Sequence, residues 1–242
     1  MSREGRLYTD LAEYYDQIYH WKDYRKEVDE IRGLIRKHKR SPGIALLDVA
    51  CGTGKHLSFL RRDFDCVGLD ASAAMLAVAK RNTNGVRFVL GDMREFDLGK
   101  KFDVILCLFS AIGHLRTRND LRRALLNFAR HLKKGGVIIV EPWIQGPQWK
   151  GSMPRMQIYD SKPLKIIRLN YGRSDGTFSY IDERYLIGKK GKGIDYIVDR
   201  DKLRYFEPDF ALSVLRGAGL EAEFTQDGLM PDRGLLIATK TC

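Results

Sequence analysis

The sequence predicts a single α/β domain in which a doubly wound, mostly parallel seven-stranded sheet carries an added antiparallel β layer. Residues 44–49 form an apolar run that ends in a glycine-rich turn, and strand-like and helix-like runs alternate from there to residue 140. Such alternation is typical of a parallel sheet covered by helices on both faces. Beyond residue 143, strand-like runs follow one another without helices between them, which is typical of antiparallel strands.

The composition is that of one soluble domain. A chain of 242 residues with 44% hydrophobic residues is long enough to bury one substantial core. No apolar run reaches the roughly 18 residues that a membrane span requires, and residues 1–10 are too polar for a signal peptide. The four cysteines, Cys51, Cys66, Cys107 and Cys242, form no CxxC pair, so we expect them to be reduced and buried. We therefore expect a cytoplasmic protein that binds no membrane.

The first 40 residues predict a helical lid made of two helices. Residues 8–19 are rich in tyrosine, and residues 23–38 carry apolar residues at helical spacing. The tyrosine-rich helix has two interpretations: it closes the edge of the core, or it covers a binding site. Both interpretations require partners for the hydroxyl groups, because a buried tyrosine hydroxyl needs a hydrogen bond.

Residues 41–143 predict the cofactor-binding core. Its strands are expected at residues 44–49, 66–69, 86–90, 102–108 and 137–140, and its helices at residues 56–62, 72–81 and 119–132. The glycine turn at residues 51–54 is expected to open the first helix, and Gly135 and Gly136 to open the last strand. The turn then lies at the carboxyl edge of the sheet, where helix N-termini present free N–H groups to ligands.

The last hundred residues divide into an insertion and a return to the core sheet. Residues 144–206 predict the antiparallel insertion, with strands at residues 165–170, 177–187 and 194–205. Residues 207–242 predict the return, with a helix at residues 208–216 and strands at residues 221–225 and 234–239.

Three nucleotide cofactors compete for such a glycine turn. A Walker phosphate loop needs a glycine five residues before Gly54 and a serine or threonine after Lys55, where this chain has Val49 and His56. A dinucleotide fingerprint needs a third glycine where this chain has Leu57, which disfavours NAD. S-adenosylmethionine contains no phosphate and fits the turn better.

Three acids that follow three successive strands supply partners for S-adenosylmethionine. Asp48 is expected to face the ammonium of the methionyl group, while Gly52 and Gly54 let the backbone approach the ligand. Asp70 is expected to accept hydrogen bonds from both ribose hydroxyls, and Asp92 from the adenine amine. Each acid taken alone is also a candidate helix cap, Asp70 above all, but the three together favour the cofactor.

Five segments carry a resemblance to a known family: residues 47–54 (LDVACGTG), 91–94 (GDMR), 109–115 (FSAIGHL), 140–143 (VEPW) and 233–235 (RGL). Through these segments the chain resembles the dTDP-amino-sugar N,N-dimethyltransferases of macrolide sugar biosynthesis. Residues 46–54, 68–70 and 91–93 resemble more broadly the class I S-adenosylmethionine-dependent methyltransferases, which have a Rossmann-like sheet. The resemblance implies methyl transfer to the amine of a small molecule, such as a nucleotide-linked amino sugar, with S-adenosylhomocysteine as product.

The resemblance also implies roles for residues at matching positions. Tyr15 and Tyr24 are implied to contact the methionyl end of the cofactor, and Trp143 and Arg233 to bind the substrate. The expected cofactor-binding residues are Tyr15, Tyr24, Asp48, Ala50, Gly52, Gly54, Asp70, Ala71, Asp92, Met93 and Leu108. The chain departs from the family at Ile144, where the family has a second aromatic residue.

The chemistry of an amine acceptor points to a base. A protonated amine cannot attack a methyl group, so a group near it must remove the proton. His114, at the carboxyl edge of the fourth strand, is the candidate base, and Tyr8 is expected to orient the amine; both resemble acceptor-side residues of the family. The alternative is a histidine that caps its loop and packs against the next helix. No metal site is expected, because the other histidines have no suitably spaced acidic or thiol partners.

The net charge of +11 raises an alternative function, that of an RNA-binding protein or RNA methyltransferase. The densest basic run, residues 36–40, ends a predicted helix, where cations complement the helix dipole, so a solvated surface explains it. A cavity with room for a sugar and a cationic mouth would favour the small molecule, whereas a flat basic surface would favour RNA. We expect a small-molecule acceptor, with the antiparallel insertion on the acceptor side, and either a monomer or a homodimer.

Overall fold

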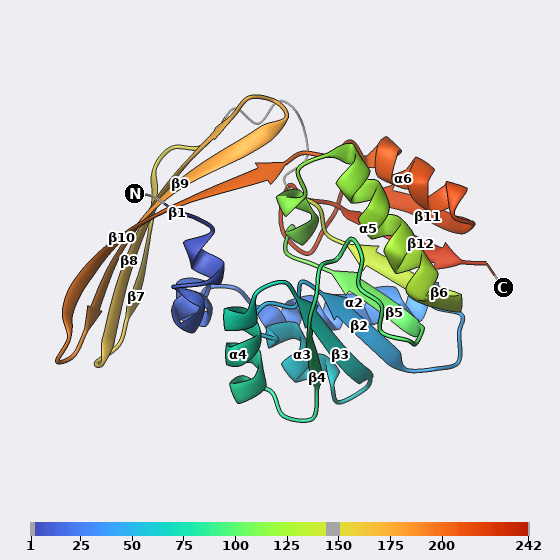
Figure 1. Cartoon of the computed structure of the whole chain (residues 1–242), viewed down its shortest axis with the longest axis horizontal. Helices are drawn as coiled ribbons and strands as arrows, with labels where there is room; N and C mark the ends of the chain where they lie inside the picture. Colours follow the sequence, from blue (N-terminus) through green and yellow to red (C-terminus); the bar gives the residue numbers. More distant parts are fainter. Residues whose placement is uncertain (1–2, 144–150, 242) are drawn as a thin grey trace.

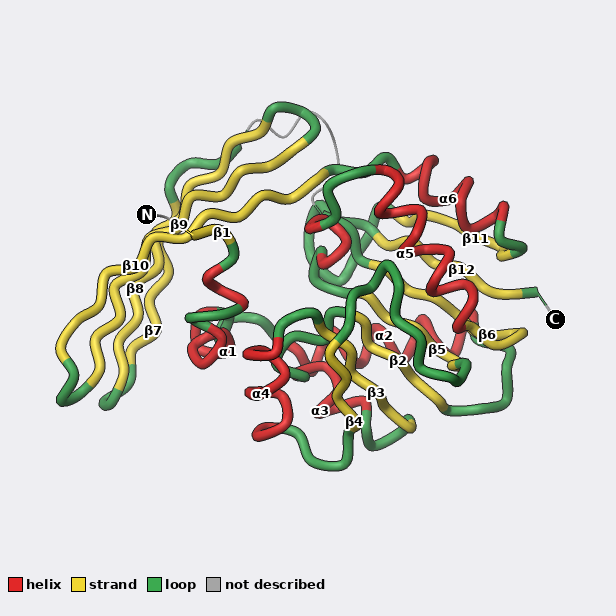
Figure 2. The backbone as a smooth tube through the Cα atoms, viewed as in Figure 1, coloured by secondary structure: helices red, strands yellow, loops and turns green. Residues whose placement is uncertain are grey.

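A computed structural model of the chain contains two β-sheets, one of seven strands and one of five (Figure 1). The structure describes residues 3–143 and 151–241, so the expectations for Ile144 and Cys242 lie outside the described residues. The helices accompany the seven-stranded sheet and the N-terminal segment, whereas the five-stranded sheet consists of strands and turns (Figure 2).

The seven-stranded sheet is mixed but mostly parallel. Its strands are β2 (Ala45–Val49), β3 (Asp65–Asp70), β4 (Arg87–Leu90), β5 (Phe102–Cys107), β6 (Leu132–Val140), β11 (Leu220–Thr225) and β12 (Leu235–Lys240). They lie in the order β11-β12-β6-β5-β2-β3-β4, and β12 runs antiparallel to both of its neighbours. The fold class predicted from the sequence is confirmed.

Helices cover both faces of this sheet. The helices are α2 (Tyr24–His38), α3 (Lys55–Leu60), α4 (Ala73–Asn82), α5 (Arg118–His131) and α6 (Pro208–Gly217). Successive residues of β2 point to opposite faces: Leu46 packs in a cluster with Val28 and Ile31 of α2, and Leu47 in a cluster with Phe128 of α5. The central strands are therefore buried on both sides, which explains why they are apolar runs rather than alternating ones.

Side-chain caps set the starts of three helices. The side chains of Asp23, Ser72 and Thr117 each accept a hydrogen bond from a backbone N–H in the first turn of α2, α4 and α5. Each cap satisfies a donor that the helix leaves unpaired. These three helices consequently begin within a residue of the positions expected from the sequence.

The five-stranded sheet lies beside the first and has two different faces. Its strands are β1 (Arg3–Glu4), β7 (Arg155–Asp160), β8 (Leu164–Ser174), β9 (Phe178–Lys189) and β10 (Gly193–Arg204), in the order β1-β10-β9-β8-β7. On the inner face, Ile166, Tyr185 and Ile187 are buried against the N-terminal segment. The antiparallel layer is confirmed. Strand β7 was not expected, because the segment around it is rich in glycine and proline.

The expectation of one continuous helix at residues 8–19 is wrong. The segment forms two short 3₁₀ helices, Arg6–Tyr8 and Ala12–Tyr14, followed by the single turn α1 (Tyr15–Ile18). The carbonyl of Tyr8 accepts a hydrogen bond from the Ser72 hydroxyl, and the backbone amide of Leu7 donates to Asp199 at 2.8 Å. Ser72, the N-cap of α4, thus takes a carbonyl that a continuous helix would pair internally, and Asp199 of β10 fixes the backbone just before it.

Strand β6 begins earlier than expected. It starts at Leu132, so Gly135 and Gly136 lie within the strand rather than before it. Gly135 has φ of 72°, and a Cβ atom there would lie 2.8 Å from the backbone nitrogen of Ser41. Its carbonyl accepts hydrogen bonds from Arg40 and Ser41. The glycine therefore permits a close approach between two segments, which a sequence pattern presents as a turn.

Candidate active site

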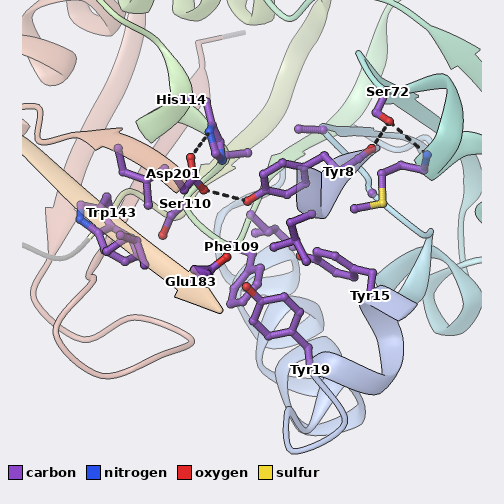
Figure 3. Close-up of a pocket in the computed structure, with 18 of the residues that line it drawn as sticks. Tyr8, Tyr15, Tyr19, Ser72, Phe109, Ser110, His114, Trp143, Glu183 and Asp201 are labelled. Atoms are coloured by element: carbon purple, nitrogen blue, oxygen red, sulfur yellow. Dashed lines mark hydrogen bonds and ion pairs between the residues drawn. The ribbon is translucent and has the colours of Figure 1, made fainter. Parts of the chain in front are cut away.

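One large cavity lies where the two sheets face each other. It has a volume of about 1420 Å³, and its walls come from the carboxyl ends of β2 to β5, the β11–β12 loop, the N-terminal segment and the inner face of the five-stranded sheet (Figure 3). A site for one small molecule has typically about 300–1,000 Å³. The cavity therefore has room for two ligands side by side.

Most of the site residues expected from the sequence line this cavity. They are Tyr8, Tyr15, Ala50, Gly52, Asp70, Ala71, Asp92, Met93, Leu108, His114, Trp143 and Arg233. The cavity wall also contains the four non-glycine residues with positive φ in the described parts of the chain, which are Ala50, Phe109, Ser110 and Asp232. Such strained conformations persist where the surrounding structure enforces them, and they are concentrated at functional sites.

Asp70 and Gly52 form the part of the wall at the ends of β2 and β3. The carboxylate of Asp70 accepts one hydrogen bond at each oxygen, from the backbone amides of Gly52 and Ser72, both at 2.8 Å. Burial raises the pKa of Asp70, and these hydrogen bonds oppose the rise. Gly52 has φ of 56° and open space where a Cβ would lie. A carboxylate with lone pairs to spare beside an open glycine fits a ligand with two neighbouring hydroxyls, such as a ribose.

Asp92 follows β4 and is held by an arginine. Nε and Nη2 of Arg94 donate to the Asp92 carboxylate, at 2.5 Å for Nη2 and Oδ2, and Nη1 donates to Asp120 at 3.2 Å. Hydrogen bonding from Arg94 lowers the pKa of Asp92, which is therefore ionised. The carboxylate remains at the cavity wall as a fixed acceptor.

Three expected cofactor residues lie outside the large cavity. Asp48 and Tyr24 line a small adjoining pocket of about 40 Å³, which also contacts Tyr15 and Gly52. Burial raises the pKa of Asp48 to about 8. Gly54 lines neither pocket: a Cβ there would lie 3.2 Å from the Phe88 ring, and its φ is 74°. In the structure, Gly54 allows the Phe88 ring to pack closely and is the residue that precedes α3.

His114 and Tyr8 meet at one carboxylate. Nδ1 of His114 lies 3.5 Å from Oδ1 of Asp201, and the hydroxyl of Tyr8 donates to Oδ2 of the same residue at 3.4 Å. The Tyr8 and His114 rings are in edge contact, with centroids 5.1 Å apart. Figure 3 shows both side chains directed toward Asp201. The structure thus brings the two residues expected on the acceptor side together on a third residue.

The strained turn after β5 is held by Glu141. This fully buried carboxylate accepts from the backbone amide of Phe109 at 2.8 Å and from that of Met230 at 3.1 Å. The hydroxyl of Ser110 donates to the carbonyl of Pro142 at 3.0 Å. The Glu-Pro-Trp motif therefore ties the β5 turn to the β11–β12 loop.

Arg233 is a buried cation at the cavity wall. It is 8% exposed, and its guanidinium lies over the rings of Phe109 and Trp143, at 4.8 and 5.3 Å from their centroids. Its Nη1 atom is buried and has no hydrogen-bonding partner among the described residues. A buried donor without a partner is costly, so the site fits an anionic ligand group. The indole N–H of Trp143 donates to the Ser179 hydroxyl at 2.8 Å.

The antiparallel insertion was expected on the acceptor side of the site, but none of its residues was named from the sequence as a site residue. Arg168, Glu183 and Asp201 line the cavity from β8, β9 and β10. Nε of Arg168 donates to Glu183 at 3.0 Å, and the Tyr185 hydroxyl donates to the other oxygen of Glu183 at 2.7 Å. The sequence did contain a sign of this contribution. In each of these strands a charged residue occupies one of the alternate positions that face inward, among apolar residues that are buried.

The described residues contain neither a metal-type cluster nor a membrane-type helix. Residues 3–143 and 151–241 hold no group of three or more histidine, cysteine, aspartate or glutamate residues able to bind a metal ion. None of the helices in these ranges combines the length and the apolar character that a membrane span requires. Cys51, Cys66 and Cys107 are free and buried, as expected.

Comparison with known proteins identifies the family. A family model described as a methyltransferase domain matches residues 46–136. The dTDP-3-amino-3,6-dideoxy-alpha-D-glucopyranose N,N-dimethyltransferase of Streptomyces fradiae is 35% identical, and the match covers 90% of this chain and 87% of the relative. The crystal structure of Streptomyces venezuelae DesVI superposes with a TM-score of 0.89 at 31% identity, covering 96% of this chain and 99% of that one.

A third relative contains the cofactor. CalS10, an amino pentose methyltransferase from Micromonospora echinaspora, was solved with S-adenosylmethionine bound; its TM-score is 0.83 at 31% identity, covering 96% of this chain and 97% of that one. The chain is an S-adenosylmethionine-dependent methyltransferase. Within that class, it belongs to the family of dTDP-amino-sugar N,N-dimethyltransferases.

Proposed function

We propose that the chain methylates the amino group of a nucleotide-linked amino sugar. The observation that carries the proposal is the cavity that joins the ligand edge of the seven-stranded sheet to His114 and to the buried cation Arg233. The printed name of the Streptomyces fradiae relative describes a dTDP-linked amino sugar as its substrate, which supports the same class here. A deep cavity also supports a small molecule over the RNA alternative, which calls for a flat basic surface.

We propose that S-adenosylmethionine occupies the side of the cavity formed by the ends of β2 to β5. Asp70 would accept from the ribose hydroxyls and Asp92 from the adenine amine, with Met93, Ala71 and Leu108 forming the adjacent wall. Ala50, Gly52, Tyr15 and Tyr24 would surround the methionyl end. A methionyl ammonium beside Asp48 would lower the pKa that burial raises and would pair with the resulting carboxylate.

S-adenosylmethionine would supply a methyl group on a sulfonium, whose carbon a neutral amine attacks in line while S-adenosylhomocysteine leaves as the thioether. The chain's own task is to hold the amine, to take its proton and to exclude water. We assign His114 as the base and Tyr8 as the residue that orients the amine. Burial, with a smaller contribution from the charge of Asp201, raises the pKa of Tyr8, so its hydroxyl remains a hydrogen-bond donor.

Arg233 and Trp143 are proposed to bind the nucleotide part of the acceptor. The diphosphate would pair with the orphaned Nη1 of Arg233, and the aromatic faces beside it suit a base.

We also propose that the chain is one methyltransferase domain. Residues 1–40 would form the lid, 41–143 the cofactor core, 144–206 the acceptor-side insertion and 207–242 the return to the core sheet. We propose a reducing, cytoplasmic compartment for it. The buried free cysteines support that compartment.

We further propose a homodimer, formed through the outer face of the five-stranded sheet. Ile158, Ile167, Leu186 and Tyr196 are directly paired neighbours on four strands, and they are 51, 37, 42 and 62% exposed. Beside this apolar row, Asp182 forms ion pairs with the arginines at positions 184 and 200. An apolar centre with flanking charges of both signs is self-complementary, which suits a two-fold contact with a second copy.

An acceptor panel tests the proposed function. The purified chain is incubated with S-adenosylmethionine and, separately, a dTDP-linked amino sugar, the same sugar without nucleotide, a dTDP-sugar with hydroxyl in place of the amine, and an RNA transcript. We expect one or two methyl groups on the dTDP-amino sugar, a higher KM for the free amino sugar, and no product from the other two. Methylation of the RNA or of the hydroxyl sugar, without methylation of the amine, contradicts the proposal.

A further inference from the structure

Asp201 belongs to the antiparallel insertion, yet its carboxylate lies between two residues of the cavity. Its side chain is 15% exposed. Oδ1 lies 3.5 Å from Nδ1 of His114, and Oδ2 accepts from the Tyr8 hydroxyl at 3.4 Å (Figure 3). The backbone amide of Lys202 also donates to Oδ1, at 2.8 Å, which holds the carboxylate in this orientation.

A neighbouring aspartate on the same strand shows what a purely structural role looks like. The two oxygens of Asp199 accept hydrogen bonds from the backbone amides of Arg6, Leu7 and Arg200 at 3.0, 2.8 and 2.8 Å. Asp199 is completely buried and joins the N-terminal segment to β10. Apart from the Lys202 amide, Asp201 instead meets side chains, and both belong to the cavity wall.

The contact between Asp201 and His114 favours a proton on Nδ1, the ring nitrogen that faces the carboxylate. A carboxylate only accepts hydrogen bonds, so an Nδ1 that faces it is favoured as the N–H donor. In the neutral ring, Nε2 then holds the free lone pair. In the opposite tautomer, the lone pair of Nδ1 would face the carboxylate oxygen at 3.5 Å, which is unfavourable.

We propose that Asp201 is the positioning residue of the acceptor site: it holds His114 with Nε2 as the proton acceptor and fixes the Tyr8 hydroxyl beside it. The catalytic consequence of this inference rests on the proposed function. The positioning of His114 and Tyr8 by Asp201 does not depend on that function. In the proton transfer, the N–H bond of the acceptor ammonium breaks and its electron pair stays on the amine nitrogen. The proton bonds to Nε2, and the resulting imidazolium keeps its Nδ1 proton, donated to Asp201. No proton passes to the carboxylate.

The first experiment measures the tautomer of His114 without any substrate. Long-range ¹H–¹⁵N correlation spectra of the full chain in alkaline buffer identify the protonated ring nitrogen, with His56 and His131 as internal references. We expect the Nδ1–H form of His114 in the unmodified chain and a gain of the Nε2–H form in Asp201→Asn, because the introduced amide can donate to Nδ1. A predominant Nε2–H form in the unmodified chain overturns the proposal, even if the variant does not fold.

The second experiment separates kcat from KM. Asp201→Asn is expected to lower kcat for the amine acceptor by about 100-fold and to leave its KM and the cofactor Kd within about threefold, because the lost step is proton transfer. Asp195→Asn, an exposed aspartate on the same strand, is the matched control and should change neither. Unchanged kcat together with an unchanged tautomer in Asp201→Asn contradicts the inference.

The two experiments distinguish failure of this inference from failure of the proposed function. A chain that methylates no amine, but whose His114 tautomer changes in Asp201→Asn, contradicts the proposed function and supports the positioning. If the Asp201→Asn variant methylates the amino sugar as well as the unmodified chain does, the proposed function is supported and the role of Asp201 in it is contradicted.

Discussion

The backbone amide of Phe109 donates a hydrogen bond of 2.8 Å to Oε2 of Glu141, across the gap between the ends of β5 and β6. The other oxygen of the same carboxylate accepts from the amide of Met230. Phe109 has φ of 51°, so this bond helps to hold a backbone conformation that few side chains adopt. One buried carboxylate thereby positions the turn that leads to His114 and the loop that leads to Arg233.

Glu141→Gln is expected to destabilise the fold by about 1–3 kcal/mol, because one of the two amides would then face an N–H group instead of an acceptor. The measurement is urea unfolding, with Glu95→Gln as the exposed control. Burial raises the pKa of Glu141, and the charge of Arg233 opposes this. A stability equal to that of the unmodified chain would show that the two hydrogen bonds contribute nothing.

Asp70→Asn is expected to weaken S-adenosylmethionine binding. A hydrogen bond to a charged group contributes about 1.5–3 kcal/mol, so the loss corresponds to a Kd about 10- to 100-fold higher. Calorimetric titration of the cofactor measures the effect. Asp65→Asn, at the exposed start of the same strand, should keep the original affinity; equal affinities for both variants would remove Asp70 from the cofactor site.

Arg233→Met is expected to raise the KM of the nucleotide-linked acceptor by at least about tenfold and to leave cofactor binding unchanged, because an anion would lose its buried partner. The fold is expected to lose part of its stability, because the Arg233 guanidinium lies over two aromatic rings and its charge stabilises the buried carboxylate of Glu141, even though the substitution also removes a buried donor that has no partner among the described residues. Steady-state kinetics and thermal unfolding provide the two readouts, and the exposed Arg62→Met serves as control. An unchanged KM would place the phosphates elsewhere.

Asp48→Asn is expected to change how stability depends on pH in the absence of cofactor. The pKa of Asp48 is raised from 3.8 to about 8, so the folded chain keeps the proton that the unfolded chain loses in this window. The stability of the unmodified chain relative to Asp48→Asn should therefore fall as pH rises through the window, by up to about 1.4 kcal/mol per pH unit. Unfolding curves at several pH values measure it; parallel curves for both proteins contradict the burial argument.

Leu169→Lys is expected to convert a dimer into a monomer. Leu169 is 45% exposed, is paired with Met156 of β7 and lies next to the apolar row on the outer face. A lysine on this face would lose its hydration when a second copy covers it, which is unfavourable. Sedimentation of the full chain gives the mass, and Leu126→Lys on α5 is the matched control. A monomer before any substitution would contradict the proposed dimer.

The cofactor core was predictable because its signals are local. A strand, a glycine turn and a helix follow one another between residues 45 and 60, and Asp70 ends the next strand, where a parallel sheet gathers its ligand residues. Periodicity and capping residues place such elements to within a residue or two. The same reasoning failed for residues 8–19, where partners on other elements decide the backbone conformation, and for Gly135, which permits a close contact rather than a turn.

The sequence by itself determined the class of sheet, the donor and the residues at the strand ends, because neighbours along the chain set all of these. Only the tertiary structure placed Asp201 beside His114 and Tyr8, which are far from it in sequence. It also showed that Gly54, expected to contact the ligand, instead allows close packing at the start of α3. The register of an antiparallel sheet, and the face that it turns toward a cavity, depend on how several strands pair at once. No single segment carries that information.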